Sequence, residues 1–106
     1  MKWIEEIISK EPYKITCKWN DGKVTIIDLY EFLLEKSKNP NNSYSQLINT
    51  VRFLQVKCDG STLCWENGIT YTDTDGTIKQ GELDIAPELL YDIAMGFDVK
   101  KDIQNA

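Results

Sequence analysis

The chain has no histidine at all, and this absence bears first on catalysis and on metal binding. Histidine is the commonest general base in enzymes and the usual activating partner of a cysteine nucleophile. It is also a principal zinc ligand, and no Cys-x-x-Cys pair takes its place here. We therefore expect no catalytic, metal-binding or cofactor-binding residues. A small hydrolytic or thiol enzyme with an unrecognised site is the alternative.

Long apolar runs and clusters of positive charge are missing as well. The longest apolar stretches are a few residues, such as "FLL", so no membrane-spanning segment is expected. Basic residues number 12 against 17 acidic ones, and Arg52 is the single arginine among them. Nucleic acids and anionic membranes both require clustered basic side chains, so neither is an expected partner. The opening "MKWIEEIISKE" lacks the pattern of a secretory leader, and a cytoplasmic location is expected.

Asp-Gly and Asn-Gly pairs are abundant, and they are the strongest local signals for a β-hairpin. A two-residue turn centred on each pair predicts the register of the flanking strands. At Asp21-Gly22 and Asp59-Gly60 the predicted opposite pairs are Trp19 with Val24, Cys17 with Ile26, Val56 with Leu63, and Leu54 with Trp65. At Asn67-Gly68 and Asp75-Gly76 they are Trp65 with Thr70, Cys64 with Tyr71, Asp73 with Ile78, and Thr72 with Lys79.

These registers interpret two similar stretches, "WNDG" and "WENG", as strand ends that run into tight turns. Trp19 and Trp65 then point into the core. The last hairpin pairs nothing apolar, so it is expected to project into solvent. The same registers bury Cys17 and Cys58 and leave Cys64 as the thiol to test for exposure.

Helices are expected between the hairpins. "DLYEFLLEKSK" has Asp28 at the N-cap, and "SYSQLINTVRF" has Ser43 there, each with Glu or Gln three residues later. The buried face of the second helix would hold Leu47, Ile48 and Val51. "APELLYDIAMG" has Pro87 in its first turn, where proline is tolerated. The opening "WIEEIIS" fits either a strand or a helix face.

Together these elements predict an α+β fold: a small antiparallel β-sheet built from hairpins, with two to three α-helices packed on one face. Residues 1–96 form one domain in this interpretation, with an inserted hairpin at about residues 70–83. Residues 97–106 are expected to be a frayed C-terminal tail.

The order of these motifs resembles a small bacterial family, the domain of unknown function numbered 2442. The resemblance runs from about Trp3 to Ala94 and rests on three segments, "YKITCKWNDGKVTIIDL", "RFLQVKCDGSTLCWENG" and "ELDIAPELLYDIA". It implies that the opening segment is a strand. One departure is "TYTDTDGTIKQGE", an apparent insertion before the closing helix. The turn and cap positions shared with the family are Asp21, Gly22, Asp28, Trp65, Asn67, Gly68 and Pro87.

Because catalysis, nucleic acids and membranes are not expected, we expect a protein-interaction module. The resemblance adds that some relatives are similar to members of two-gene toxin–antitoxin pairs. This chain would then be the acidic, antitoxin-like or accessory member, and its partner a small basic protein. Tyr71, Cys64 and Gln55 are the candidate partner surface. Homodimerisation by pairing at an open sheet edge is the other arrangement considered, because the strand "ITYTD" carries neither Lys nor Pro.

Overall fold

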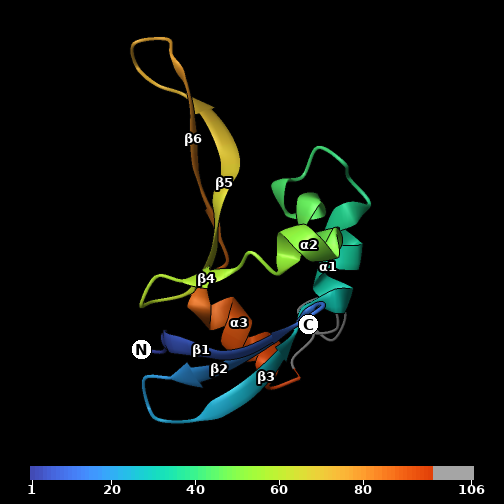
Figure 1. Cartoon of the computed structure of the whole chain (residues 1–106), viewed down its shortest axis with the longest axis vertical. Helices are drawn as coiled ribbons and strands as arrows, with labels where there is room; N and C mark the ends of the chain where they lie inside the picture. Colours follow the sequence, from blue (N-terminus) through green and yellow to red (C-terminus); the bar gives the residue numbers. More distant parts are fainter. Residues whose placement is uncertain (97–106) are drawn as a thin grey trace, which may run out of the picture.

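The structure is a computed structural model that describes residues 1–96, and it has an α+β fold, as predicted (Figure 1). The predicted tail, residues 97–106, lies outside the described residues. The strands are β1 (Ile4–Glu11), β2 (Lys14–Trp19), β3 (Val24–Asp28), β4 (Lys57–Cys58), β5 (Leu63–Thr72) and β6 (Ile78–Asp84). The helices are α1 (Tyr30–Ser37), the 3-10 helix η1 (Ser43–Ile48), α2 (Thr50–Phe53) and α3 (Pro87–Ala94).

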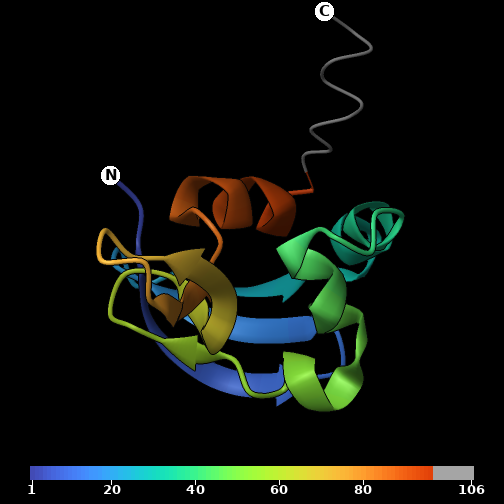
Figure 2. The ribbon, with the colours of Figure 1, turned by 90° about the horizontal axis from the view of Figure 1, so that it is seen from above.

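The strands form two antiparallel sheets rather than the single sheet expected, with the orders β1-β2-β3 and β4-β5-β6. The opening segment is therefore a strand, and the helical alternative is wrong. A hydrogen bond from the Ile4 N–H to the Ser61 carbonyl, 2.8 Å long, links the two sheets. Figure 2 shows α3 lying along β3, consistent with the contacts between these two elements.

One hydrophobic core joins both sheets and the helices. Trp19 and Trp65 are fully buried in it, which confirms their predicted role as core anchors. Each indole N–H has a partner inside the protein: that of Trp19 donates to the Thr25 hydroxyl, and that of Trp65 donates to the Phe53 carbonyl. A buried indole N–H usually has such a partner, because leaving it unpaired would cost free energy.

The predicted registers at Asp21-Gly22 and Asp75-Gly76 are wrong by one residue, for the same reason. Val24 lies opposite Lys18 and Ile78 opposite Thr72. A two-residue type I′ turn needs positive φ at both central residues, but in each pair only the glycine has it. In each hairpin a turn is followed by a glycine in the left-handed conformation, which makes a three-residue loop. Each cross-strand pair is therefore displaced by one residue from the predicted pair.

The register at Asp59-Gly60 is wrong by two residues, which leaves the faces unchanged. Cys58 pairs with Leu63, and the Asp59 N–H donates to the Thr62 carbonyl, so the turn is centred on Gly60 and Ser61. The glycine then occupies the first central position, where type II′ turns take glycine. Val56 and Leu63 are both buried as expected, whereas Leu54 is exposed at the end of α2 instead of facing Trp65.

The predicted turn at Asn67-Gly68 does not exist, because β5 continues past these two residues without reversing direction. Trp65 lies opposite Leu83 and Ile69 opposite Gly81, so the three residues 66–68 face Glu82 alone. We call residues 66–68 the bulge. Asn67 takes the left-handed conformation, with φ of 56°, which asparagine tolerates better than most residues. "WNDG" is thus a turn and "WENG" is a bulge, in spite of their similarity.

The segment "SYSQLINTVRF" is broken rather than one continuous helix. Asn49 is extended, with ψ of 119°, and separates η1 from α2. Asn42, not Ser43, caps η1 by accepting from the Tyr44 N–H, and Asn49 caps α2 in the same way. Because the break changes the helical phase, Val51 is 71% exposed instead of buried.

The other two helices begin close to where the sequence predicts. Asp28 ends β3 and Leu29 occupies the N-cap of α1, so the predicted cap is wrong by one residue. The Asp28 carboxylate nevertheless accepts a hydrogen bond from the Tyr30 N–H at 3.0 Å. Pro87 starts α3, and Gly96 follows it with φ of 83°, a left-handed glycine after the helix end.

Replacing Trp65 with alanine tests the core. We expect Trp65→Ala to lower the free energy of unfolding by about 3–5 kcal/mol, because it leaves a large cavity in the core. Trp3→Ala is the control, since this side chain is 41% exposed. It should cost less than about 1 kcal/mol in urea denaturation. Equal stability of the two variants would contradict the placement of Trp65.

Replacing Gly68 with alanine tests the bulge. A Cβ at this position would lie 2.3 Å from the Leu83 Cβ, a distance that requires the two strands to separate. We expect Gly68→Ala to destabilise the fold by about 1–3 kcal/mol. Gly81→Ala is the matched control, because its Cβ meets flexible side-chain atoms of Ile69 and Tyr71 at 3.2–3.3 Å. If Gly68→Ala had the smaller effect in urea denaturation, the close approach of β5 to β6 would be wrong.

Candidate functional site

The distal half of the β5–β6 hairpin projects away from the rest of the protein, as Figure 1 shows. We call residues 69–81 the arm. Four residues at the end of β5 pair with four at the start of β6, and none of the residues 69–81 is buried. The prediction that the Asp75-Gly76 hairpin projects into solvent is therefore confirmed. Two strands alone form a ribbon with no core of its own.

The base of the arm is held by side chains from the helical segments. The Arg52 guanidinium donates to the Glu66 carbonyl, and the Gln46 amide donates to the Gly68 carbonyl at 2.8 Å. Arg52 also donates to the Gln46 side chain, which ties the two together. These contacts occupy the outer edge of β5 along the bulge. Beyond the bulge, β6 is the one strand among residues 1–96 that pairs with β5.

Two large side chains are exposed on opposite faces of the arm. Tyr71 is 47% exposed and lies opposite Lys79, and Ile78 is 76% exposed and lies opposite Thr72. The Tyr71 ring lies beside Gly81, within 3.3 Å of where a Cβ would stand, so it covers the bare backbone there. A half-exposed tyrosine fixed in this way is a suitable binding anchor, because little side-chain entropy remains to be lost.

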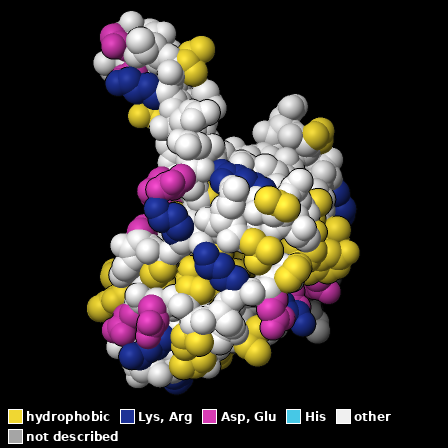
Figure 3. All heavy atoms as spheres, in the orientation of Figure 1, with side chains coloured by type: hydrophobic (Ala, Val, Ile, Leu, Met, Phe, Trp, Pro, Cys, Tyr) yellow, Lys and Arg dark blue, Asp and Glu magenta, His cyan; other side chains and the backbone are white. Residues whose placement is uncertain are grey.

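Negative charge is concentrated on the sheet that carries the arm. Residues 57–84 contain six Asp or Glu and two Lys, which gives −4 of the chain's net charge of −5. Residues 1–56 are nearly neutral, with eight basic and seven acidic side chains. In Figure 3 acidic side chains appear at the base of the arm and near its tip, each place also showing a lysine, and Asp73 is paired with Lys79 and Glu66 with Lys57. The surface around the arm is thus complementary to a basic partner.

The structure does not assemble the predicted partner surface of Tyr71, Cys64 and Gln55. Cys64 is 2% exposed, so its predicted exposure is wrong. It lies seven residues from Tyr71 along β5, roughly 20 Å at the usual rise of a strand. Gln55 is exposed after α2, where its side chain accepts from Arg52 at 2.8 Å. Of the three residues, Tyr71 alone belongs to the arm.

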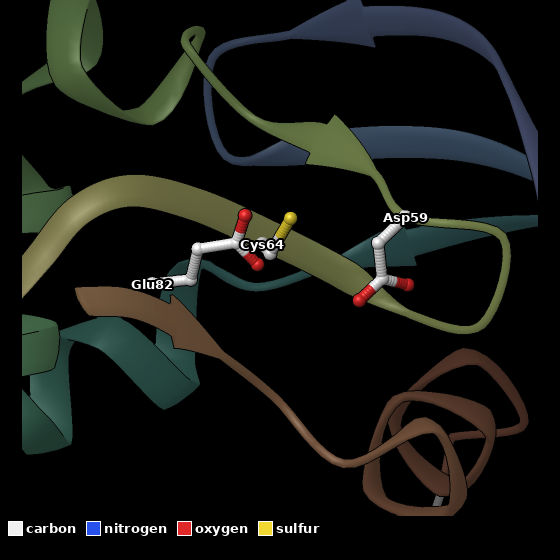
Figure 4. A group of neighbouring side chains, drawn as sticks. All are labelled: Asp59, Cys64 and Glu82. Atoms are coloured by element: carbon white, nitrogen blue, oxygen red, sulfur yellow. The ribbon is translucent and has the colours of Figure 1, made fainter.

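A second group of side chains, not predicted from the sequence, gathers at the base of the hairpin. Asp59 from the β4–β5 turn, Cys64 from β5 and Glu82 from β6 place one ligand atom each within 4.8 Å of the others (Figure 4). Cys64 is opposite Lys57 on one side and Asp84 on the other, so Asp59 and Glu82 are its diagonal neighbours. The sequence gives no signal for this group, since the three residues have no metal-ligand spacing.

The electrostatics of this group centre on the Cys64 thiol. Burial raises its pKa to about 11, with further increases from the carboxylates of Glu82 and Asp59 and from a hydrogen bond to Glu82. Lys57 acts in the opposite direction, but its ammonium is paired with Glu66. Cys17 is different, because burial in the apolar core raises its pKa to about 12 with no carboxylate beside it among the causes.

Cys58 is the most accessible of the three thiols, contrary to its predicted burial. It is half-buried, and its thiol donates to the Ile4 carbonyl at 3.4 Å. All three cysteines are free. The thiol and the two carboxylates that do come together could bind a cation.

Comparison of the chain with protein-family models, curated proteins and solved structures finds no match. The resemblance to the domain of unknown function numbered 2442 therefore stays a prediction. Within residues 1–96, no helix has the length and apolar character needed to cross a membrane.

The order of thiol reactivity tests these placements. We expect a disulfide reagent such as Ellman's reagent to modify Cys58 first in the folded protein. Cys64 and Cys17 should react at least about tenfold more slowly, because both are buried and protonated at neutral pH. The reaction is followed by stopped-flow absorbance. Comparison of Cys58→Ser and Cys64→Ser with the wild type shows which thiol gives the fast phase and which gives a slow one. A fast phase that disappears in Cys64→Ser instead of Cys58→Ser would contradict the burial of Cys64.

Proposed function

We propose that this chain is a protein-interaction module that binds a basic partner protein through the arm. The observation that carries the proposal is the arm itself, a projecting two-stranded ribbon that exposes Tyr71 and Ile78. A solitary hairpin is at best marginally stable in water, and it gains stability when a partner covers its faces or extends its edge. A ribbon held rigidly at its base and free at its tip suits this kind of binding.

The charge distribution favours a basic protein over a second copy of the chain. Two copies would bring together surfaces that both carry the negative charge of residues 57–84, which disfavours their association. A basic partner would meet complementary charge around the two exposed anchors. This arrangement agrees with the acidic member of a two-gene pair, the role that the family resemblance implies. We also propose the cytoplasm as its compartment, where free thiols are maintained.

The proposal is tested by capturing partners from the host lysate with the wild-type protein and with the double variant Tyr71→Ser, Ile78→Ser. Val51→Ser is the matched control, since it removes an equally exposed apolar side chain away from the arm. We expect one stoichiometric basic protein to be captured by the wild type and by the control. The arm variant should bind it at least about tenfold more weakly, the loss expected when binding anchors are truncated.

Calorimetry with the purified partner then measures the affinity at two salt concentrations. Binding should weaken as salt rises, because complementary surface charges are screened. A partner that binds the arm variant with unchanged affinity would refute the proposal. So would a purified protein that light scattering shows to be an arm-dependent dimer, since the arm would then be occupied by a second copy.

A further inference from the structure

The base of the hairpin brings together two features of metal sites, a pair of carboxylates and a buried thiol. Two carboxylates from separate segments converge on the exposed face of the β4-β5-β6 sheet, and a buried thiol points between them (Figure 4). We propose that Asp59, Cys64 and Glu82 form a binding site for one Zn²⁺-like divalent cation. The site lies outside the arm, and its test does not require the proposed partner.

The donor set selects the class of cation. Thiolate with carboxylate ligands suits zinc and similar borderline-soft ions, whereas Ca²⁺ and Mg²⁺ prefer oxygen ligands throughout. Three protein ligands leave the fourth tetrahedral position for a water molecule. Binding replaces the proton of the Cys64 thiol with the metal ion, and that proton is released to solvent.

The spacing of the donors is close to what such an ion requires. Ligand atoms around tetrahedral zinc stand roughly 3.5 Å apart, and those of the three side chains lie within 4.8 Å of one another. Closing the remaining ångström requires small movements of Asp59 and Glu82, whose side chains are exposed, while the Cys64 sulfur is fixed by burial.

Both carboxylates are positioned by the backbone around them. One oxygen of Asp59 accepts from the N–H groups of Ser61 and Thr62, at 2.9 and 2.8 Å, which orients the carboxylate and leaves its second oxygen available. Glu82 is the single β6 residue opposite the bulge, a setting in which strands commonly redirect a side chain. The thiol supplies the independent feature, because Cys64 is only 2% exposed and its sulfur lies within 4.8 Å of a carboxylate oxygen of each acidic residue.

The charge around the thiol also favours a cation. One carboxylate oxygen each of Glu82 and Asp59 lies within 4.8 Å of the Cys64 sulfur, so two negative charges surround the thiol. Lys57 is the basic residue near the Cys64 thiol, but its ammonium is paired with the Glu66 carboxylate. A divalent ion would stabilise all three negative groups at once.

Titration with Co²⁺, a spectroscopic substitute for Zn²⁺, tests the site directly in the full-length protein. We expect a thiolate-to-cobalt charge-transfer band that saturates at one ion per chain and disappears when Zn²⁺ is added. Ca²⁺ and Mg²⁺ should not displace the cobalt. Cys58→Ser should keep the band and Cys64→Ser should lose it, which distinguishes the site from adventitious binding at the accessible thiol.

Two further variants separate ligation from folding. Asp59→Asn keeps the oxygen that accepts from Ser61 and Thr62, and Glu82→Gln changes an exposed side chain, so both should retain wild-type thermal stability without metal. Each variant should weaken Co²⁺ binding by at least about tenfold. Even the loss of a residue that only supports a metal ligand costs about that much affinity. Absence of the charge-transfer band in the wild type, a band that survives Cys64→Ser, or unchanged affinity in both carboxylate variants would overturn the proposal.

Discussion

The structure depends on the bulge that interrupts β5 between Trp65 and Ile69. Before the bulge β5 belongs to the core, with Leu63 and Trp65 buried, and after it the same strand becomes the exposed arm. The close approach that Gly68 permits to Leu83 keeps β6 paired across the interruption. One strand can therefore anchor the hairpin in the core and still carry a ribbon beyond it.

The bulge also connects the two candidate surfaces. It leaves carbonyls on the outer edge of β5 that Arg52 and Gln46 bind, which fixes the direction of the arm. On the other side of the bulge, Glu82 of β6 lies opposite the three residues 66–68. Its carboxylate is close to Cys64 and to Asp59 in the β4–β5 turn. A binding arm and a cation site at its base would both lose their geometry if β5 were regular. That common dependence explains why we regard the hairpin, rather than the β1-β2-β3 sheet, as the functional part of the molecule.

Sequence reasoning recovered the elements better than their registers. The hairpins around Gly22, Gly60 and Gly76 exist, and Trp19 and Trp65 are buried, because local turn chemistry and apolar patterning are encoded in neighbouring residues. The predicted registers were wrong because an Asp-Gly pair alone does not specify the length of the loop or the residues on which the turn is centred. Asn67-Gly68 failed for a different reason: its glycine is required by the distant Leu83, a contact that no local pattern reveals.

The candidate sites show the same limit. The projecting hairpin and Tyr71 were predictable, since "TYTDTDGTIKQGE" is polar and pairs nothing apolar. The group of Asp59, Cys64 and Glu82 was not, because it needs a register shift of two residues at one turn and a bulge in place of another. The burial of Cys64 was not predictable either, since the register shift leaves its face of the sheet unchanged.

Cross-strand nuclear Overhauser effects in the labelled protein test the bulge most directly. We expect contacts between the backbone protons of Ile69 and Gly81 and between those of Trp65 and Leu83, and none between Trp65 and Thr70. Contacts between Trp65 and Thr70 would instead show a tight turn at Asn67-Gly68. That result would contradict the continuous β5 strand, and with it the placement of both the arm and the Asp59, Cys64 and Glu82 group.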